Sequence, residues 1–238
     1  SGFIVDKSGY IITNAHVIEN ASRITVKLES GEEFVAKIVG ADEETDIAVL
    51  KIDAGRDLPA LVFGDPDRAE VGDWVLAVGS PFGLAKSVTA GIISALGRDI
   101  GSGPYDEFLQ TDAAINKGNS GGPLLDSGGR LIGVNTQIVS PSGAFAGIGF
   151  AVPVDTVNRI VPELIKHGKL IRPGLGISLV PDAMARRWGV KGVIIGKVGR
   201  GSAAERIGLH GARETAGGRV ELGDIIVAVD GKPVEVML

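Results

Sequence analysis

Glycine is the residue that most constrains how this chain can fold. The 238 residues include 36 glycines, about twice the ordinary share, placed singly or in pairs between β-branched runs and forming no repeat. Glycine is unfavourable inside helices and favoured in tight turns, so this spacing predicts many strands joined by short turns. With 44% hydrophobic and 22% charged residues, the chain has the composition of a folded globular protein.

Short apolar and β-branched segments recur between turn signals up to about residue 152. They predict strands at residues 3–5, 10–13, 24–28, 34–39, 47–52, 74–78, 88–96, 131–138 and 148–152. Residues 6–9, Asp-Lys-Ser-Gly, are expected to close the first hairpin, and the strict alternation of residues 23–28 indicates a strand with one solvent-exposed face. This pattern predicts an antiparallel barrel or sandwich.

One clear helix is predicted, beginning after Pro153 and ending at Gly168, with Asp155 placed to cap it. Its apolar stripe at helical spacing consists of Val157, Ile160, Val161, Leu164 and Ile165. Pro162 lies inside the stripe and should kink or split the helix, because proline lacks a backbone donor and crowds the preceding turn.

A second strand-rich module is expected after this helix, with a short helix at residues 203–207 and strands at residues 192–197 and 224–229. We therefore predict two domains, residues 1–170 and residues 171–238. Because the chain opens on strand-like residues, we expect its N-terminus to be truncated.

Composition excludes several classes of function. The chain has no cysteine, so disulfides, thiolate zinc sites and cysteine nucleophiles are ruled out. Its formal net charge of -5, without a long basic run, argues against nucleic-acid binding. No apolar run reaches the roughly 18 residues that a membrane span requires. There is no His-Glu-x-x-His motif and no histidine cluster, so we expect neither a metal site nor another cofactor.

The segment Gly118-Asn119-Ser120-Gly121-Gly122 has the features of a serine nucleophile. A serine hydroxyl attacks a carbonyl carbon only when a base accepts its proton and backbone N–H groups bind the oxyanion. Gly118 would let its own N–H and that of Ser120 point the same way, while Gly121 and Gly122 would leave room for a substrate backbone. Taken alone, a Ser-Gly-Gly run is more often an ordinary glycine-rich hairpin.

Three histidines are candidates for the base. His167 precedes Gly168 in a last helical turn, where a capping role explains it, and His210 lies in a glycine-rich loop without a serine or acid motif. His16 follows Ile11-Ile12-Thr13-Asn14-Ala15 and is expected at the end of an apolar strand that holds the ring rigidly. A lone histidine there is more often structural, so its assignment depends on the serine and on an acid.

Asp46 is the candidate for the acid that orients the base. Most of the acidic run at residues 42–46 is expected to be a solvated loop. Asp46 differs because it directly precedes the apolar strand at residues 47–50, where its carboxylate can hold the ring N–H of a neutral histidine. His16, Asp46 and Ser120 therefore lie in one β-rich module and together predict a serine endopeptidase.

With these residues identified, the chain resembles the HtrA (Deg) family of chymotrypsin-fold serine proteases over nearly its whole length. The matching motifs are Thr13-Asn14-Ala15-His16-Val17, Thr45-Asp46-Ile47-Ala48-Val49-Leu50, residues 110–123, Gly147-Ile148-Gly149-Phe150-Ala151 and Arg172-Pro173-Gly174-Leu175-Gly176-Ile177. The resemblance implies an all-β protease domain of two six-stranded antiparallel β-barrels with the three catalytic residues in the cleft between them. A partial α+β PDZ module would follow.

The resemblance also implies an oxyanion hole formed by Gly118, Asn119 and Ser120, with the N–H groups of Gly118 and Ser120 as donors. Digestive proteases of this fold carry an acid before the nucleophile, and that acid pairs with a newly cut N-terminus. Asn119 stands at this position and cannot make the ion pair, so activation by removal of a propeptide is not expected.

Further residues match the family's substrate pocket and its regulatory loop. The pocket would be lined by Ala114, Ile115, Asn135 and Thr136. Because Ala114 and Ile115 carry no charge, we expect small or medium aliphatic side chains at the P1 position of the substrate. Residues 96–107, with Arg98 near their start, match the loop that senses the PDZ module, and the glycine-rich residues 101–104 are consistent with a mobile segment.

Residues 173–238 resemble a PDZ domain, in which Gly174-Leu175-Gly176-Ile177 would capture a peptide C-terminal carboxylate on backbone N–H groups. The chain stops at Leu238, before the helix and strand that would complete the groove, so we expect an incomplete module. Residues 213–219 look like an inserted loop. The resemblance further implies a homotrimer or a larger assembly of trimers.

The leading hypothesis is an ATP-independent serine endopeptidase of protein quality control and the stress response. It would degrade unfolded or misfolded proteins and peptides in an extracytoplasmic compartment such as the periplasm, with no nucleic-acid partner and no integral membrane segment. The alternative is a chaperone that binds unfolded chains on the same fold without cutting them. A secreted digestive protease is less consistent with the absent cysteines and the PDZ-like tail.

Overall fold

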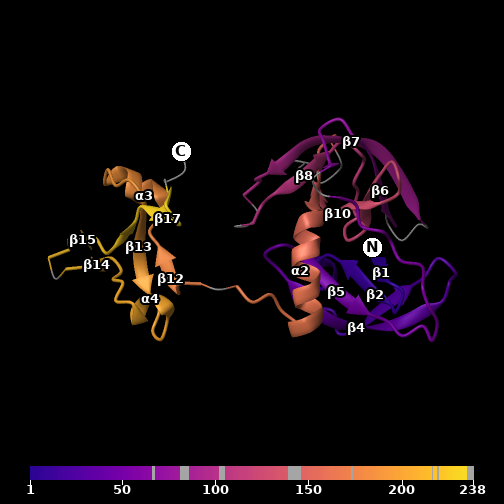
Figure 1. The fold of residues 1–238 in the computed structure, drawn as a ribbon, viewed down its shortest axis with the longest axis horizontal. Coiled ribbons are helices and arrows are strands. Elements are labelled where there is room, and N and C mark those ends of the chain that lie inside the picture. The colour runs from indigo at the N-terminus through magenta and orange to yellow at the C-terminus, as the bar shows by residue number, and fades with distance from the viewer. Residues whose placement is uncertain are drawn as a thin grey trace. The chain divides into compact units, whose positions relative to one another are not determined.

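The chain divides into two compact units, Ser1–Ile171 and Arg172–Leu238, which are described separately (Figure 1). The computed structural model describes residues 1–65, 68–80, 86–101, 105–138, 146–172, 174–215, 217–218 and 220–234. Among the helices of these residues, none combines the length and apolar character needed to cross a membrane.

The first unit begins with a five-stranded antiparallel sheet in the order β1-β2-β5-β4-β3. Its strands are β1 (Phe3–Asp6), β2 (Tyr10–Thr13), β3 (Ile24–Lys27), β4 (Glu33–Asp42) and β5 (Ile47–Lys51). The first hairpin closes as predicted: Gly9 has φ +100° and donates its N–H to the Asp6 carbonyl at 2.9 Å. Strand β3 alternates between half-buried and exposed residues, which confirms the prediction of one solvent-exposed face.

The second half of this unit is a closed barrel in the order β10-β11-β8-β7-β6-β9. Its strands are β6 (Trp74–Gly79), β7 (Ser87–Arg98), β8 (Phe108–Thr111), β9 (Pro123–Asp126), β10 (Leu131–Ile138) and β11 (Gly149–Pro153). The predicted six-stranded barrel is therefore present once. In the first half, and within the described residues, β1 pairs with β2 alone and β3 with β4 alone, so that sheet stays open.

Helix α2 (Val154–His167) contacts β4 and β5 of the open sheet and β10 and β11 of the barrel (Figure 1). One buried core joins all three parts. It contains Phe3, Ile12, Ile47 and Val49 from the sheet, Phe108, Leu131, Val134, Phe150 and Val152 from the barrel, and Val154, Val157, Ile160, Val161 and Leu164 from the helix. Burying this apolar surface holds the sheet and the barrel in a fixed relation.

The details of α2 differ from the prediction in three ways. Pro153 occupies the N-cap position, while Asp155 lies in the first turn and its carboxylate accepts the Thr156 N–H at 2.7 Å. The helix runs through Pro162 as one element, because buried side chains on both sides of the proline supply packing that outweighs the lost hydrogen bond. Ile165 is 39% exposed and does not belong to the buried stripe. Gly168 ends the helix in the left-handed conformation, as predicted.

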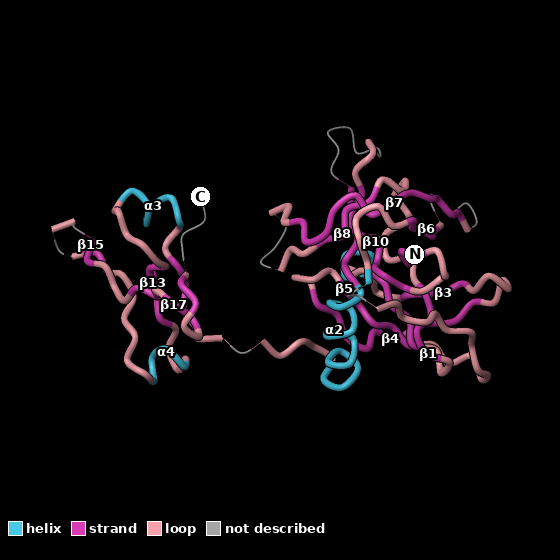
Figure 2. The backbone as a smooth tube through the Cα atoms, turned by 45° about the horizontal axis from the view of Figure 1, so that its top comes forward, coloured by secondary structure: helices cyan, strands magenta, loops and turns pink. Residues whose placement is uncertain are grey.

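The second unit is a small α+β arrangement (Figure 2). Its elements are β12 (Ile177–Leu179), α3 (Asp182–Arg187), β13 (Val193–Val198), α4 (Ala203–Arg206), β14 (Arg213–Glu214), β15 (Val220–Glu221), β16 (Ile225–Ile226), β17 (Ala228–Val229) and β18 (Lys232–Pro233). Helix α4 confirms the predicted short helix, and the Ser202 hydroxyl caps it by accepting the Glu205 N–H at 3.1 Å.

Two predictions for the second unit need correction. The strand predicted at residues 224–229 is interrupted, with β16 pairing with β13 and β17 pairing with β18. The expected inserted loop begins instead as β14, which forms a hairpin with β15, and the Arg213 Nε bonds to Glu221 at 2.8 Å across it. Residues 216 and 219 of that segment, like Pro173 and Leu238, lie outside the described residues.

Candidate active site

His16 lies on a short helix and not at the end of a strand as predicted. Strand β2 ends at Thr13, Asn14 follows in an extended conformation, and helix α1 (Ala15–Ile18) starts immediately after it. The Asn14 side chain does not cap this helix; its amide donates to the Asp46 carbonyl at 2.8 Å. This bond attaches the start of α1 to the residue that faces the histidine.

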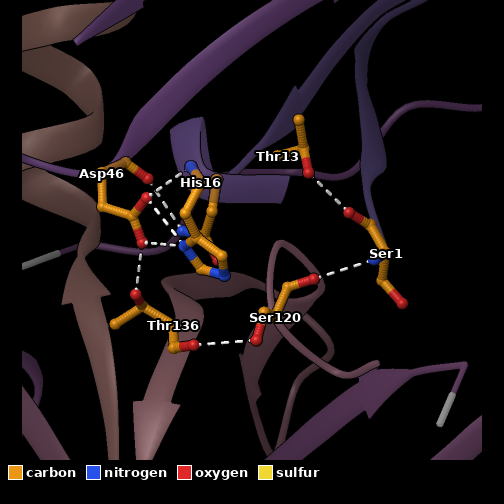
Figure 3. Close-up of polar contacts among 7 residues, drawn as sticks. Ser1, Thr13, His16, Asp46, Ser120 and Thr136 are labelled. Carbon is orange, nitrogen blue, oxygen red and sulfur yellow. Dashed lines mark hydrogen bonds and ion pairs between the residues drawn. The ribbon is translucent and has the colours of Figure 1, made fainter. Parts of the chain in front are cut away.

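Asp46 adopts a left-handed backbone conformation, with φ +57°. Few residues other than glycine adopt this region, and aspartate is among those that tolerate it best. In this conformation one carboxylate oxygen accepts the backbone N–H of His16 at 3.0 Å, and the two oxygens lie 2.9 and 2.8 Å from the ring Nδ1 (Figure 3). Because a carboxylate only accepts, Nδ1 is the donor.

Of the neighbouring acidic residues, Glu43 and Glu44 are exposed as predicted, but Asp42 is not. Asp42 is buried and accepts the Thr45 N–H at 3.1 Å and the Thr45 hydroxyl at 2.6 Å. These bonds shape the turn that presents Asp46, so Asp42 is part of the folded structure and not of a solvated loop.

The environment of His16 favours its charged form. The hydrogen bond to Asp46 raises the pKa of the imidazole above its ordinary value, and partial burial of the ring opposes that shift. The His16 side chain is 47% exposed and the Asp46 side chain 22%. The ring is therefore held from one edge by the carboxylate and remains open to solvent elsewhere.

Thr136, on β10, connects the acid to the serine. Its hydroxyl donates to Asp46 Oδ2 at 2.5 Å, and its carbonyl accepts the Ser120 hydroxyl at 2.8 Å (Figure 3). In the view of Figure 3 the His16 ring lies between the Asp46 carboxylate and Ser120. Within the described residues, the bonded acceptor of the Ser120 hydroxyl is the Thr136 carbonyl and not the imidazole.

The backbone around Ser120 leaves two N–H groups free. Gly118 has φ +105°, Asn119 donates its N–H to the Asn116 carbonyl at 2.9 Å, and Gly121 donates to the Asn135 carbonyl at 2.8 Å. In the described part of the chain, the N–H groups of Gly118 and Ser120 donate to no acceptor. They are available to an oxygen atom of a bound molecule.

Gly121 and Gly122 make room for the protein's own backbone, which corrects the prediction that they make room for substrate. A Cβ on Gly121 would lie 2.3 Å from the Ser1 carbonyl oxygen and 2.4 Å from Thr13 Oγ1. A Cβ on Gly122 would lie 2.1 Å from the Val78 carbonyl oxygen. These glycines therefore let the Ser120 turn pack against β6 and the start of the chain.

The four expected pocket residues occupy different environments. Ala114 is half-buried, and its carbonyl accepts the Thr89 hydroxyl at 2.8 Å. Ile115 is 1% exposed and packs against Gly149. Asn135 is fully buried, and its amide donates to the carbonyls of Val78 and Pro123. Asn135 thus braces the barrel, and Thr136 supports Asp46, so neither side chain forms an open pocket wall.

Two other predicted sites lie elsewhere. Arg98 is the last residue of β7, where its Nε donates to Gln110 Oε1 at 3.0 Å, so the expected loop begins only after it. Residues 102–104 of that loop lie outside the described residues. Residues 174–177 belong to the second unit, where the Leu175 carbonyl accepts the Ala204 N–H at 2.9 Å and Ile177 already starts β12.

One contact to the Ser120 turn has no counterpart in the sequence prediction. Ser1 bonds to the carbonyls of Gly118 and Ser120, and no motif marks a serine at this place. Among the described residues there is no cluster of three or more histidine, aspartate or glutamate side chains that could hold a metal ion.

Comparison with known proteins identifies the family. The trypsin-like peptidase domain matches residues 1–134 of the chain. A probable periplasmic serine endoprotease, DegP-like, of Brucella suis biovar 1 (strain 1330) is 46% identical over 241 residues, covering 99% of this chain and 45% of the relative. The chloroplastic Protease Do-like 1 of Arabidopsis thaliana is 48% identical over 239 residues, covering 98% of this chain and 54% of the relative.

Solved structures similar to this chain are also HtrA-type or serine endoproteases. The HtrA-type protease AlgW with a decapeptide matches 98% of this chain and 70% of its own, with a TM-score of 0.85 and 41% identity. The serine endoprotease from Yersinia pestis matches 98% of this chain and 73% of its own, with a TM-score of 0.75 and 39% identity. The chain spans about half the length of the curated relatives it matches. It belongs to the trypsin-like peptidases, within the HtrA (DegP-like) serine proteases.

Proposed function

We propose that this chain is a serine endopeptidase in which Ser120 is the nucleophile, His16 the general base and Asp46 the acid that orients the base. The observation that carries the proposal is the bonding of Asp46. Its carboxylate binds the His16 ring on helix α1 and the Thr136 hydroxyl on barrel strand β10, and Thr136 also binds Ser120. One carboxylate thereby links the elements that present the base and the nucleophile.

The reaction would proceed through an acyl-enzyme. Rotation of the Ser120 side chain moves its hydroxyl from the Thr136 carbonyl to the free Nε2 of His16, which takes the proton as the oxygen attacks the substrate carbonyl. The N–H groups of Gly118 and Ser120 would bind the oxyanion. His16 then gives the proton to the leaving amine, and water releases the acyl group by the same steps in reverse.

The substrates we propose are unfolded or misfolded proteins in an extracytoplasmic or organelle compartment. Relatives named periplasmic and chloroplastic support the compartment, and the names serine endoprotease and protease support the reaction. Half-buried Ala114 and buried Ile115, both uncharged, favour small or medium aliphatic side chains at P1. The second unit would act as a PDZ module in which residues 174–177 receive a peptide C-terminus. The loop that begins near Arg98 would sense this module. The assembly would be built from trimers.

The test is labelling by a fluorophosphonate, which reacts only with a serine activated by a base. Incubation of the folded chain near pH 8 should modify Ser120, identified by mass spectrometry of its peptide, while the heat-unfolded chain and the Ser120→Ala variant stay unmodified. A Ser127→Ala variant, changed in an exposed turn, serves as the matched control. A folded chain that captures unfolded protein without taking the label would refute the peptidase and support a non-cleaving chaperone.

Replacing Thr136 by valine is expected to lower kcat while preserving the fold. Valine has the shape of threonine and keeps the backbone carbonyl that Ser120 uses, but it removes the donor to Asp46 Oδ2. A hydrogen bond to a charged group is worth about 1.5–3 kcal/mol, so kcat should fall roughly 10- to 100-fold. Steady-state cleavage of a peptide reporter measures kcat. The control is Thr25→Val, at an exposed position of strand β3. Equal rates for the two variants would show that Asp46 does not need Thr136.

A further inference from the structure

We propose that Ser1 is a positioning residue for the oxyanion site, because its hydroxyl fixes the backbone of Gly118. The inference rests on the proposed function, in which Gly118 and Ser120 supply the N–H donors. Ser1 would not touch substrate. It would act by holding the peptide groups that follow Gly118 and Ser120, and through them the positions of the two donor residues.

The Ser1 hydroxyl makes two hydrogen bonds, one as donor and one as acceptor. It donates to the Gly118 carbonyl at 2.6 Å and accepts the Ser80 N–H at 2.9 Å. Since Ser80 follows the end of β6, the hydroxyl ties Gly118 to the barrel strand beside it. The donor to Gly118 is therefore fixed in direction and does not exchange freely with water.

The backbone of Ser1 makes a second set of contacts. Its nitrogen donates to the Ser120 carbonyl at 2.8 Å, with a longer contact of 3.5 Å to the Gly118 carbonyl. Its carbonyl accepts the Thr13 hydroxyl at 2.6 Å, which anchors Ser1 to the end of β2 (Figure 3). Ser1 thus bonds to the carbonyls of both residues whose N–H groups are free.

Fixing these carbonyls sets the peptide groups on the C-terminal side of Gly118 and Ser120. In a trans peptide the C=O and N–H bonds point in opposite directions, so a bound carbonyl sets the direction of the next N–H. The Asn119 carbonyl accepts the Gly122 N–H at 2.9 Å, which turns the Ser120 N–H the other way. The peptide after Gly118 is held at its carbonyl by Ser1 and at its N–H by Asn116.

Gly118 needs such a restraint because glycine is the most permissive residue in φ and ψ. Its φ of +105° is only one of several conformations open to a residue without Cβ. With the following peptide held by Ser1, the direction of the Gly118 N–H is restricted as well. The packing around Gly121 also supports a restraint by Ser1. A Cβ on Gly121 would lie 2.3 Å from the Ser1 carbonyl oxygen, so the Ser120 turn lies directly against Ser1.

The test compares four variants of Ser1 and one control. Ser1→Ala removes the hydroxyl without adding volume, and Ser1→Val and Ser1→Thr are matched in shape but differ in the hydroxyl. Ser22→Ala, at an exposed serine without a hydrogen bond to any described residue, is the control. A fourth variant, Ser1→Gly, reports whether loss of Cβ adds to loss of the hydroxyl. Each is assayed for kcat, KM and inhibition by a peptide boronate, whose adduct places an oxygen at the two N–H groups.

We expect Ser1→Ala and Ser1→Val to lose roughly 10- to 100-fold in kcat with KM unchanged, because a misplaced donor weakens only the charged transition state. The boronate should bind more weakly by the same factor, and Ser1→Thr should restore both values. Wild-type kcat in Ser1→Ala and Ser1→Val, a loss confined to KM, or a Ser1→Thr as poor as Ser1→Val would overturn the inference. A wild-type chain that neither cleaves nor takes the fluorophosphonate label would instead refute the proposed function, and the role of Ser1 with it.

Discussion

Replacing Ser120 by alanine should reduce kcat for casein or a peptide reporter by about 10⁶-fold, leaving only background hydrolysis. The reaction needs an oxygen nucleophile whose proton passes to His16, and alanine offers none. Folding should be little affected, since the hydroxyl makes one hydrogen bond, to the Thr136 carbonyl, worth about 0.5–1.5 kcal/mol. Thermal unfolding followed by circular dichroism would show whether the variant keeps its fold.

The same experiment has an internal control in the double variant. Residues that act as one unit are not additive, so Ser120→Ala combined with His16→Ala should be no slower than Ser120→Ala alone. A Ser120→Ala chain that retains more than a small fraction of the wild-type rate would show that another group is the nucleophile. The Ser127→Ala variant should cleave at the wild-type rate.

Most strands of the first unit could be predicted from sequence because their patterns are local. Alternation in β3 and the continuous apolar run of β5 each reflect which faces are buried. The strands β8 and β9 were missed. Each pairs with a longer strand on both sides, and β9 starts with Pro123, so this pairing decides their conformation more than their own preference does.

The helix α1 was missed for a related reason. It has only four residues, Ala15–Ile18, too few for a helical period to show, and the Asn14 side chain at its N-cap bonds to Asp46 instead of capping it. Contacts made after folding hold it: the His16 N–H donates to the Asp46 carboxylate, and the Ala15 N–H donates to the Asp46 carbonyl at 3.2 Å. Sequence identified both partners but not the geometry that joins them.

Sequence also could not show which atoms the glycines of the Ser120 turn accommodate. A glycine fits either a positive φ or a place too close for a Cβ, and the neighbour in the second case is found only in the folded chain. At Gly122 that neighbour is the Val78 carbonyl, and at Gly121 it is Ser1. The bonds from Ser1 to Gly118 span 117 positions of sequence, and no local pattern can report such a contact.

Replacing Asp46 by asparagine should lower kcat by about 10⁴-fold and also move the pH profile. Asparagine can present an N–H to the ring and stabilise the wrong tautomer, so Nε2 would carry the proton and could not accept one from Ser120. In the wild type, the bond to Asp46 raises the pKa of His16 above its ordinary value. Since the neutral ring is the base, wild-type activity should rise with pH through a midpoint above that of an unperturbed histidine.

The direction of the shift in the variant follows from the same contacts. Removing the carboxylate abolishes both the hydrogen bond and the negative charge that raise the pKa of His16. In the pH profile of kcat, the rise on the acidic side (the acidic limb) should therefore move to lower pH, while the maximal rate (the plateau) falls. Asp57→Asn removes one negative charge at an exposed ion pair with Lys7 and should change neither the plateau nor the limb. An Asp46→Asn limb at or above the wild-type midpoint would mean that the group titrating in the rate profile is not His16.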